Sequence, residues 1–117
     1  MAIPKYPVPD RRTAPRLKVH LGCQLIFERI QHDAYIKDIS PIGALLLSSF
    51  MPPPEADVLI KIETHLIRIP IVLEGKVVRR DSIDTEQGAV GAFAVKFSRN
   101  TPALMLLINK IVNPQIV

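Results

Sequence analysis

The sequence predicts a mainly β domain, a small antiparallel barrel of six or seven strands followed by one C-terminal helix. Two observations predict this fold class. Short segments of alternating apolar and polar residues recur between residues 17 and 97, and each is bounded by proline, glycine or a polar turn. After Thr101 the apolar residues recur at helical spacing instead. With 117 residues, the chain has the length of one domain with one core.

The first half of the predicted barrel contains three strands. Apolar residues alternate with polar or small ones over 17–28, which indicates a half-buried strand with Cys23 on its buried face. A second extended segment, 33–39, leads into the turn Ser40-Pro41-Ile42-Gly43, and 44–48 continues as a third strand. The turn is therefore expected to be the tip of a hairpin.

The second half begins after a stiff connector, 51–55, whose three prolines cannot donate hydrogen bonds to a sheet. A bend or bulge is expected at Gly75, and the polar segment 81–88 is expected to be a loop. Alternation and β-branched residues predict the remaining strands at 58–64, 67–73, 76–80 and 89–97.

The C-terminal helix is predicted over about 101–112. Thr101 can cap it, Pro102 suits its first position, and Leu104, Leu107, Ile108 and Ile111 recur at helical spacing. The segment 103–108 is apolar around more than one face, which one-sided docking on a barrel does not require. Either the helix is deeply seated, or Met105 and Leu106 belong to a partner or dimer surface. Both interpretations stay open.

Composition favours an anionic partner in a reducing compartment. Lys and Arg number 15 against 11 Asp and Glu, a net charge of +4, and the chain has no Trp and only 5% aromatic residues, so its core must be aliphatic. The single cysteine excludes an internal disulfide. No signal sequence and no apolar run long enough to span a bilayer is apparent, so a cytoplasmic protein without membrane insertion is expected.

Two short motifs carry most of the functional information. The first is an arginine cluster, Arg11, Arg12 and Arg16, whose guanidinium groups can bind phosphate oxygens in a forked geometry. The second is the segment Asp38-Ile39-Ser40-Pro41-Ile42-Gly43. Alternate residues of an extended segment point the same way, so Asp38 and Ser40 are expected to face one ligand, while Gly43 permits a turn with positive φ. Each motif is common on its own, and their order along the predicted barrel makes the pair informative.

In this order, the two motifs resemble the signatures of the PilZ domain, a family of bacterial receptors for cyclic di-GMP. The family has an Arg-x-x-x-Arg element, often preceded by another arginine, and an Asp/Asn-x-Ser-x-x-Gly element on its barrel. Similar to the family are also Ala44-Leu45-Leu46-Leu47 and the late stretch Val95-Lys96-Phe97. Ala94 stands before that stretch, where the family usually has glycine. The resemblance covers about 10–113.

The resemblance implies a PilZ-like split barrel over about 17–97 and a PilZ domain over 10–117. The three prolines of residues 1–9 predict a flexible, extended arm before this domain. The resemblance also implies that Arg12 and Arg16 bind phosphate and guanine, that Asp38 and Ser40 read guanine, and that Gly43 allows close backbone approach. Arg11 is associated in the family with binding a stacked pair of ligand molecules. The function implied is a non-enzymatic, cytoplasmic adaptor that changes the conformation of its arginine segment and regulates a partner in motility, adhesion or exopolysaccharide control.

Two alternatives to this function stay open. A basic barrel that binds single-stranded nucleic acid would use Arg11, Arg12, Arg16, Lys18 and His20 along a phosphate backbone, but the sequence offers few aromatic residues for base stacking. A PilZ-type interaction protein that binds no nucleotide is the other. Monomer and homodimer are both possible.

The sequence predicts no cofactor, no catalytic residues and no metal site. The three histidines share no metal-ligand spacing with each other or with Cys23, and no nucleophile elbow or phosphate-binding glycine loop is present.

Overall fold

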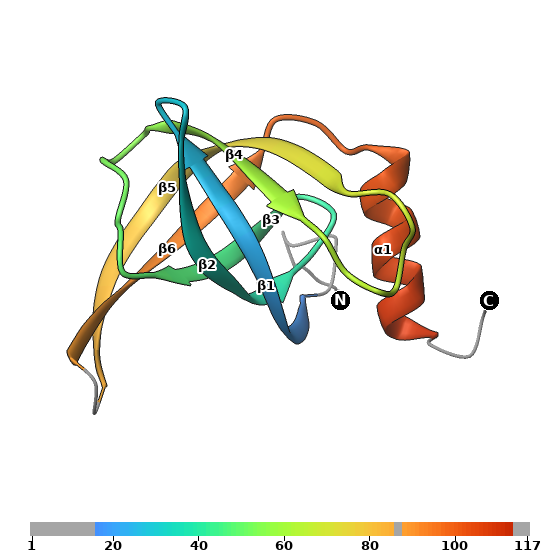
Figure 1. Ribbon diagram of the computed structural model, residues 1–117, viewed down its shortest axis with the longest axis horizontal. Helices are drawn as coiled ribbons and strands as arrows, with labels where there is room; N and C mark the ends of the chain where they lie inside the picture. Colours follow the sequence, from blue (N-terminus) through green and yellow to red (C-terminus); the bar gives the residue numbers. More distant parts are fainter. Residues whose placement is uncertain (1–15, 86–87, 114–117) are drawn as a thin grey trace, which may run out of the picture.

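A computed structural model describes residues 16–85 and 88–113 of the chain (Figure 1). It is a closed six-stranded antiparallel barrel with one helix beside it, as the sequence predicts. Around the barrel the strands follow the order β1-β2-β3-β6-β5-β4, and β4 pairs back with β1. The elements are β1 Leu17–Phe27, β2 Ile30–Ile39, β3 Gly43–Ser48, β4 Asp57–Ile62, β5 Ile71–Thr85, β6 Gly88–Phe97 and α1 Pro102–Val112.

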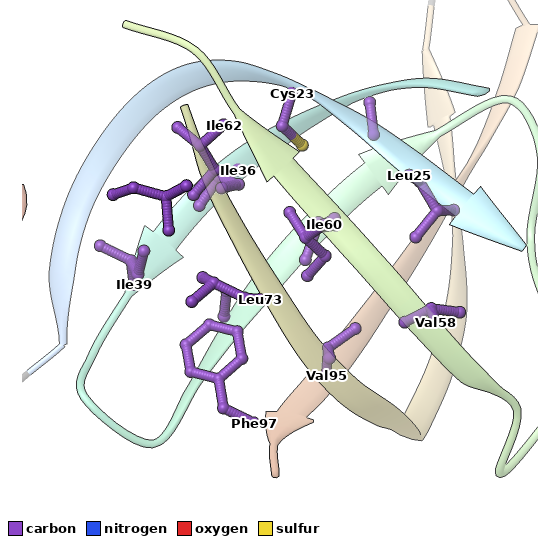
Figure 2. Packing of buried hydrophobic residues seen from close by; sticks show 14 of the residues in the cluster. Cys23, Leu25, Ile36, Ile39, Val58, Ile60, Ile62, Leu73, Val95 and Phe97 are labelled. Carbon is purple, nitrogen blue, oxygen red and sulfur yellow. The ribbon is translucent and has the colours of Figure 1, made fainter. Parts of the chain in front are cut away.

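Aliphatic side chains and phenylalanine make up most of the barrel interior. Inward-pointing side chains from all six strands fill it, and Figure 2 shows Ile36, Ile60, Leu73 and Val95 converging there. Cys23 lies in this core, as its position in the alternating pattern predicts. Leu104 and Leu107 of α1 are fully buried in the same cluster, so the helix and the barrel share one core.

The first hairpin turns more tightly than the sequence predicts. Glu28 and Arg29 have φ values of 52° and 70°, the left-handed pair that a two-residue hairpin turn requires. As a result β2 begins at Ile30 and not at residue 33. The turn has neither the Gly nor the Asn that usually mark this geometry, so local composition gave no signal for it.

Two predictions about the start of β5 are wrong. Residues 63–70 form a loop and not a strand, because Pro70 cannot donate to a ladder, while Leu66 and Ile67 pack on the core from the loop. No break occurs at Gly75, where the strand is continuous. An added Cβ there would collide with the Val95 side chain, so this glycine provides room for β6. The irregularity lies between Val77 and Arg79.

The predicted polar loop 81–88 is also wrong. β5 continues to Thr85 and pairs with β6 as far as Gly88, so the two strands extend past the barrel as a long hairpin (Figure 1). The segment suggested a loop because its polar residues show no apolar alternation, which is the sequence signal of a strand.

The closing pair of the barrel is short. β1 and β4 share three register pairs, from Gln24 with Lys61 to Ile26 with Leu59, whereas β5 and β6 share ten. We call this β1–β4 ladder the seam of the barrel.

Helix α1 begins and ends close to the prediction. Thr101 is its N-cap, and its hydroxyl accepts a hydrogen bond from the Leu104 amide at 3.2 Å. Figure 1 places the helix on the side of the barrel where β4 ends and β5 begins, next to the loop 63–70. No helix in the described part of the chain is long and apolar enough to cross a bilayer.

Candidate functional site

The two sequence motifs meet at the start of β1 and the end of β2. Arg16 Nη1 donates a hydrogen bond to Asp38 Oδ1 at 2.9 Å, although the residues are 22 positions apart. The antiparallel register causes this contact, because Leu17 is paired with Ile39 and Lys18 with Asp38. The Arg16 side chain is 42% exposed and that of Asp38 is 18% exposed. The pair is therefore accessible from solvent, and most donors of the guanidinium are not engaged by Asp38.

A bulge directs Asp38 outward. In β2, Ala34 and Ile36 point into the core, so strict alternation would place Asp38 inside as well. The ladder with β3 instead skips Lys37, since Ile36 is paired with Leu46 and Asp38 with Leu45. After this shift Ile39 becomes the next core residue, and the carboxylate stays out of the apolar interior, where its charge would be costly.

Ser40 has a different environment from Asp38. The strand ends at Ile39, so alternation does not relate the two side chains, and the structure does not bring them onto one exposed face. Ser40 is 1% exposed, and its hydroxyl accepts hydrogen bonds from the amides of Ile42 and Gly43 at 3.2 and 3.3 Å. The Ser40 amide donates to Gly43 O at 2.9 Å. The serine thus holds the hairpin turn together from within.

Gly43 is required for close strand approach. Its φ is not in the left-handed region, so the prediction of a positive φ is wrong. An added Cβ would instead lie 2.5 Å from Val95 O, a separation that real Cβ atoms do not show. The neighbouring Phe97 amide donates to Ile42 O at 2.8 Å, which ties the turn to the end of β6. The turn that follows Asp38 is therefore fixed against the barrel from both sides.

Beside Asp38, on the outer surface of the barrel, lie two apolar residues that the sequence did not point to, Leu45 and Ala94. One cross-strand row runs from Asp38 through Leu45 and Ala94 to Arg79. Ala94 is 7% exposed but does not belong to the core cluster, so it is covered by its neighbours on the outside of the barrel. The row ends at Arg79, whose side chain is exposed. Only strand register places these residues in one row, and no local pattern could have shown it.

Two of the three histidines stack on aromatic rings. His20 stacks on Tyr35 at 5.0 Å on the outer face of β1 and β2, and His32 stacks on Phe50 at 3.8 Å. Within 16–85 and 88–113, no group of three His, Cys, Asp or Glu side chains is placed to hold a metal ion.

The Cys23 thiol is unreactive at neutral pH. Burial raises the pKa of its thiol from 9.0 to about 12, so the thiolate that would act as a nucleophile or metal ligand does not form at neutral pH.

The remaining predicted residues divide into two groups. Arg11, Arg12 and the arm 1–9 lie outside the described residues. Met105 and Leu106 are described and differ: Met105 packs partly on the core, whereas Leu106 is half exposed.

Comparison with known proteins identifies similarity over nearly the whole chain. The family model described as "PilZ domain" matches residues 10–113. A search of curated proteins found no match.

Solved structures share the fold at low sequence identity. The PilZ domain with c-di-GMP of YcgR from Escherichia coli aligns with a TM-score of 0.66 and 12% identity, over 88% of this chain and 89% of that one. The Bacillus subtilis inhibitor of motility MotI/DgrA aligns with a TM-score of 0.69 and 16% identity, over 92% and 52%. The K. pneumonia MrkH–c-di-GMP complex aligns with a TM-score of 0.69 and 16% identity, over 93% of this chain and 54% of that one. The chain spans about half the length of the last two proteins.

Proposed function

Because the chain belongs to the PilZ domain family, we propose that it is a receptor for cyclic di-GMP, bound between the arginine segment 11–16 and the strand end that carries Asp38. The contact between Arg16 and Asp38 is the observation that carries this proposal, since it joins the two motifs in space. Cyclic di-GMP has two phosphates and two guanines. A guanidinium binds a phosphate or the Hoogsteen edge of guanine, and a carboxylate accepts from guanine N–H groups.

Each site residue then has a distinct role. Arg16 binds phosphate or guanine while its contact with Asp38 holds the carboxylate in one orientation. Asp38 reads guanine. Ser40 and Gly43 contribute by fixing the turn and bringing backbone close to the ligand, which agrees with the internal hydrogen bonds of Ser40. Arg11 and Arg12 supply further charge from the N-terminal side.

The solved relatives support the ligand class only through the family. The YcgR domain and MrkH are described with c-di-GMP, but at 12% and 16% identity their likeness to this chain is one of fold. The ligand is therefore proposed from the family and from the residues of this chain.

The proposed output is regulation of a partner protein in the cytoplasm. A ligand that binds one arrangement of the arginine segment more tightly shifts the population toward that arrangement. The segment leads directly into β1, whose first residue Leu17 packs on the core, so its ordering changes the surface at this end of the barrel. A receptor of this kind needs no catalytic group.

Isothermal titration with cyclic di-GMP tests the proposal. We expect saturable binding, weakened by roughly ten- to hundredfold in Arg16→Ala and in Asp38→Ala, because each loses a charge-assisted contact worth about 1.5–3 kcal/mol. Their thermal stability should change little, since an exposed ion pair contributes about 0–1 kcal/mol.

The matched control is Arg99→Ala, which removes an exposed ion pair to Glu74 away from the motifs and should leave affinity unchanged. The proposal is wrong if the intact protein shows no heat of binding. Steeply salt-dependent binding of single-stranded oligonucleotides without any response to cyclic di-GMP would favour the nucleic-acid alternative.

A further inference from the structure

An apolar groove lies between α1 and the loop 63–70. Its volume is about 630 Å³, within the range of clefts that hold ligands or inserted side chains. Its apolar lining comes from residues 66, 67 and 69–71 on the side of the loop and from Ala103 and Leu106 on the helix. The inner wall is firm because Leu66 and Ile67 pack partly on the barrel core.

Helix α1 presents to this groove a second row of side chains, of which two are apolar and one is a lysine. Leu104, Leu107 and Ile108 are buried against the barrel. Ala103, Leu106 and Lys110 recur at spacings of three and four residues, so they form a separate stripe along the helix, and all three line the groove. Leu106 is 50% exposed, and Ile69 across the groove is 75% exposed. Folding within the described chain leaves this apolar surface uncovered.

The charge of the groove has one sign. His65, Arg68 and Lys110 are the ionisable residues that line it, and no carboxylate among the described residues does so. Arg68 is exposed and makes no ion pair within the described part of the chain. A partner that inserts apolar side chains here would gain from carboxylates on either side of them, both in encounter rate and in orientation.

We infer that the groove between α1 and the loop 63–70 is a docking site for an acidic amphipathic helix of a partner protein. An apolar face with residues at helical spacing would lie along Ala103 and Leu106, and an acidic flank would face Arg68. The straight stripe on α1 favours a helix as the occupant, because two helices pack by fitting such rows together. The inference rests on the proposed function only in taking the domain as an adaptor; the groove itself involves none of the cyclic di-GMP residues.

The test uses two synthetic amphipathic peptides of about 18 residues, long enough to form a helix. Both carry leucines at the same helical spacing, and the polar positions are glutamate in one peptide and lysine in the other. Amide NMR spectra of the full chain are recorded during each titration. We expect the glutamate peptide to shift amides in 63–71 and 103–110, and the lysine peptide to bind at least about tenfold more weakly.

Charge reversal at Arg68 sharpens the test. Arg68→Glu should lower the affinity for the glutamate peptide by about tenfold and raise the affinity for the lysine peptide. A variant that had simply unfolded would not gain affinity for either peptide. Leu106→Asp should abolish binding of the glutamate peptide. Arg29→Glu and Ile30→Asp, at the exposed first hairpin, are the matched controls and should change neither titration.

Equal binding of both peptides, or amide shifts elsewhere on the barrel, overturns the inference. A dimer in sedimentation that Leu106→Asp converts to a monomer also overturns it, since the groove would then be occupied by a second copy. Cyclic di-GMP is titrated separately into the same samples. Nucleotide binding without peptide binding would refute only the docking site at the groove. Peptide binding without nucleotide binding would refute only the proposed cyclic di-GMP receptor.

Discussion

At the scale of single residues, the site depends on backbone fit as much as on charged groups. Asp38 is accessible because the ladder skips Lys37, and the turn after it is held by the buried hydroxyl of Ser40. Gly43 then allows β3 to approach β6 where any side chain would meet a carbonyl oxygen. The motif residues are thus of two kinds, one pair that faces solvent and another that positions it.

Substitution of the motif glycine should reveal this positioning role. We expect Gly43→Ala to lower the free energy of unfolding by about 1–3 kcal/mol, because the new Cβ forces β3 away from Val95 O. Gly22→Ala is the control, since its Cβ would meet only the Tyr35 ring at an ordinary 3.9 Å. Urea denaturation measures both variants. Equal effects of the two substitutions would contradict the close-approach argument.

Cys23 should be inert in the folded protein. At pH 8 we expect no reaction with a thiol reagent until denaturant is added, because the side chain is 7% exposed and its pKa is raised. Since the pKa is higher in the folded state, the neutral thiol contributes stability below pH 9 that is lost as the pH rises toward 12. Absorbance after reagent addition follows the reaction. Rapid labelling of native protein would show that this part of the core opens readily.

At the scale of elements, sequence patterns predicted regular strands and the helix. They missed the tight first turn and the length of the β5–β6 hairpin, which depend on how the strands pair. Alternation predicted β1, the turn at 40–43 predicted β3 after it, and the cap and the helical period predicted α1. The Glu28–Arg29 turn was missed because these residues seldom adopt left-handed φ. The β5–β6 projection was missed because a polar strand resembles a loop when only composition is considered.

The candidate site follows the same division. Spacing and residue type singled out Arg16, Asp38, Ser40 and Gly43 as candidates, and the structure joins Arg16 to Asp38 by a side-chain contact. The bulge that directs Asp38 outward could not have been found in this way. Neither could the row that ends at Arg79, because register between distant strands is not encoded in any local pattern.

The start of α1 offers a test at this scale. Thr101→Ala should lower the free energy of unfolding by about 1 kcal/mol, since it removes the hydroxyl that accepts from the Leu104 amide. Thr101→Ser keeps that hydroxyl and should retain most of the stability. Thermal unfolding followed by circular dichroism distinguishes the two variants. If serine and alanine have the same effect, the cap is not the cause.

At the scale of the whole molecule, one core joins barrel and helix while two separate surfaces remain open to solvent. The proposed nucleotide site lies on β1 and β2, and the groove lies between α1 and the loop 63–70. Leu17, Leu66 and Met105 all pack on the same cluster, so each surface is connected to the other through buried side chains.

The seam has a kinetic consequence. Its three pairs join residues about 35 positions apart, so this ladder requires the closure of a long loop but has fewer register pairs than any other ladder of the barrel. We expect the amides of 24–26 and 59–61 to exchange hydrogen by an opening of lower free energy than those between β3 and β6. Native-state exchange in low denaturant measures this difference, and equal protection of the two ladders would contradict it. With the seam open, the strands would form one curved sheet in the order β1-β2-β3-β6-β5-β4, so the barrel closes last along this line and opens first along it.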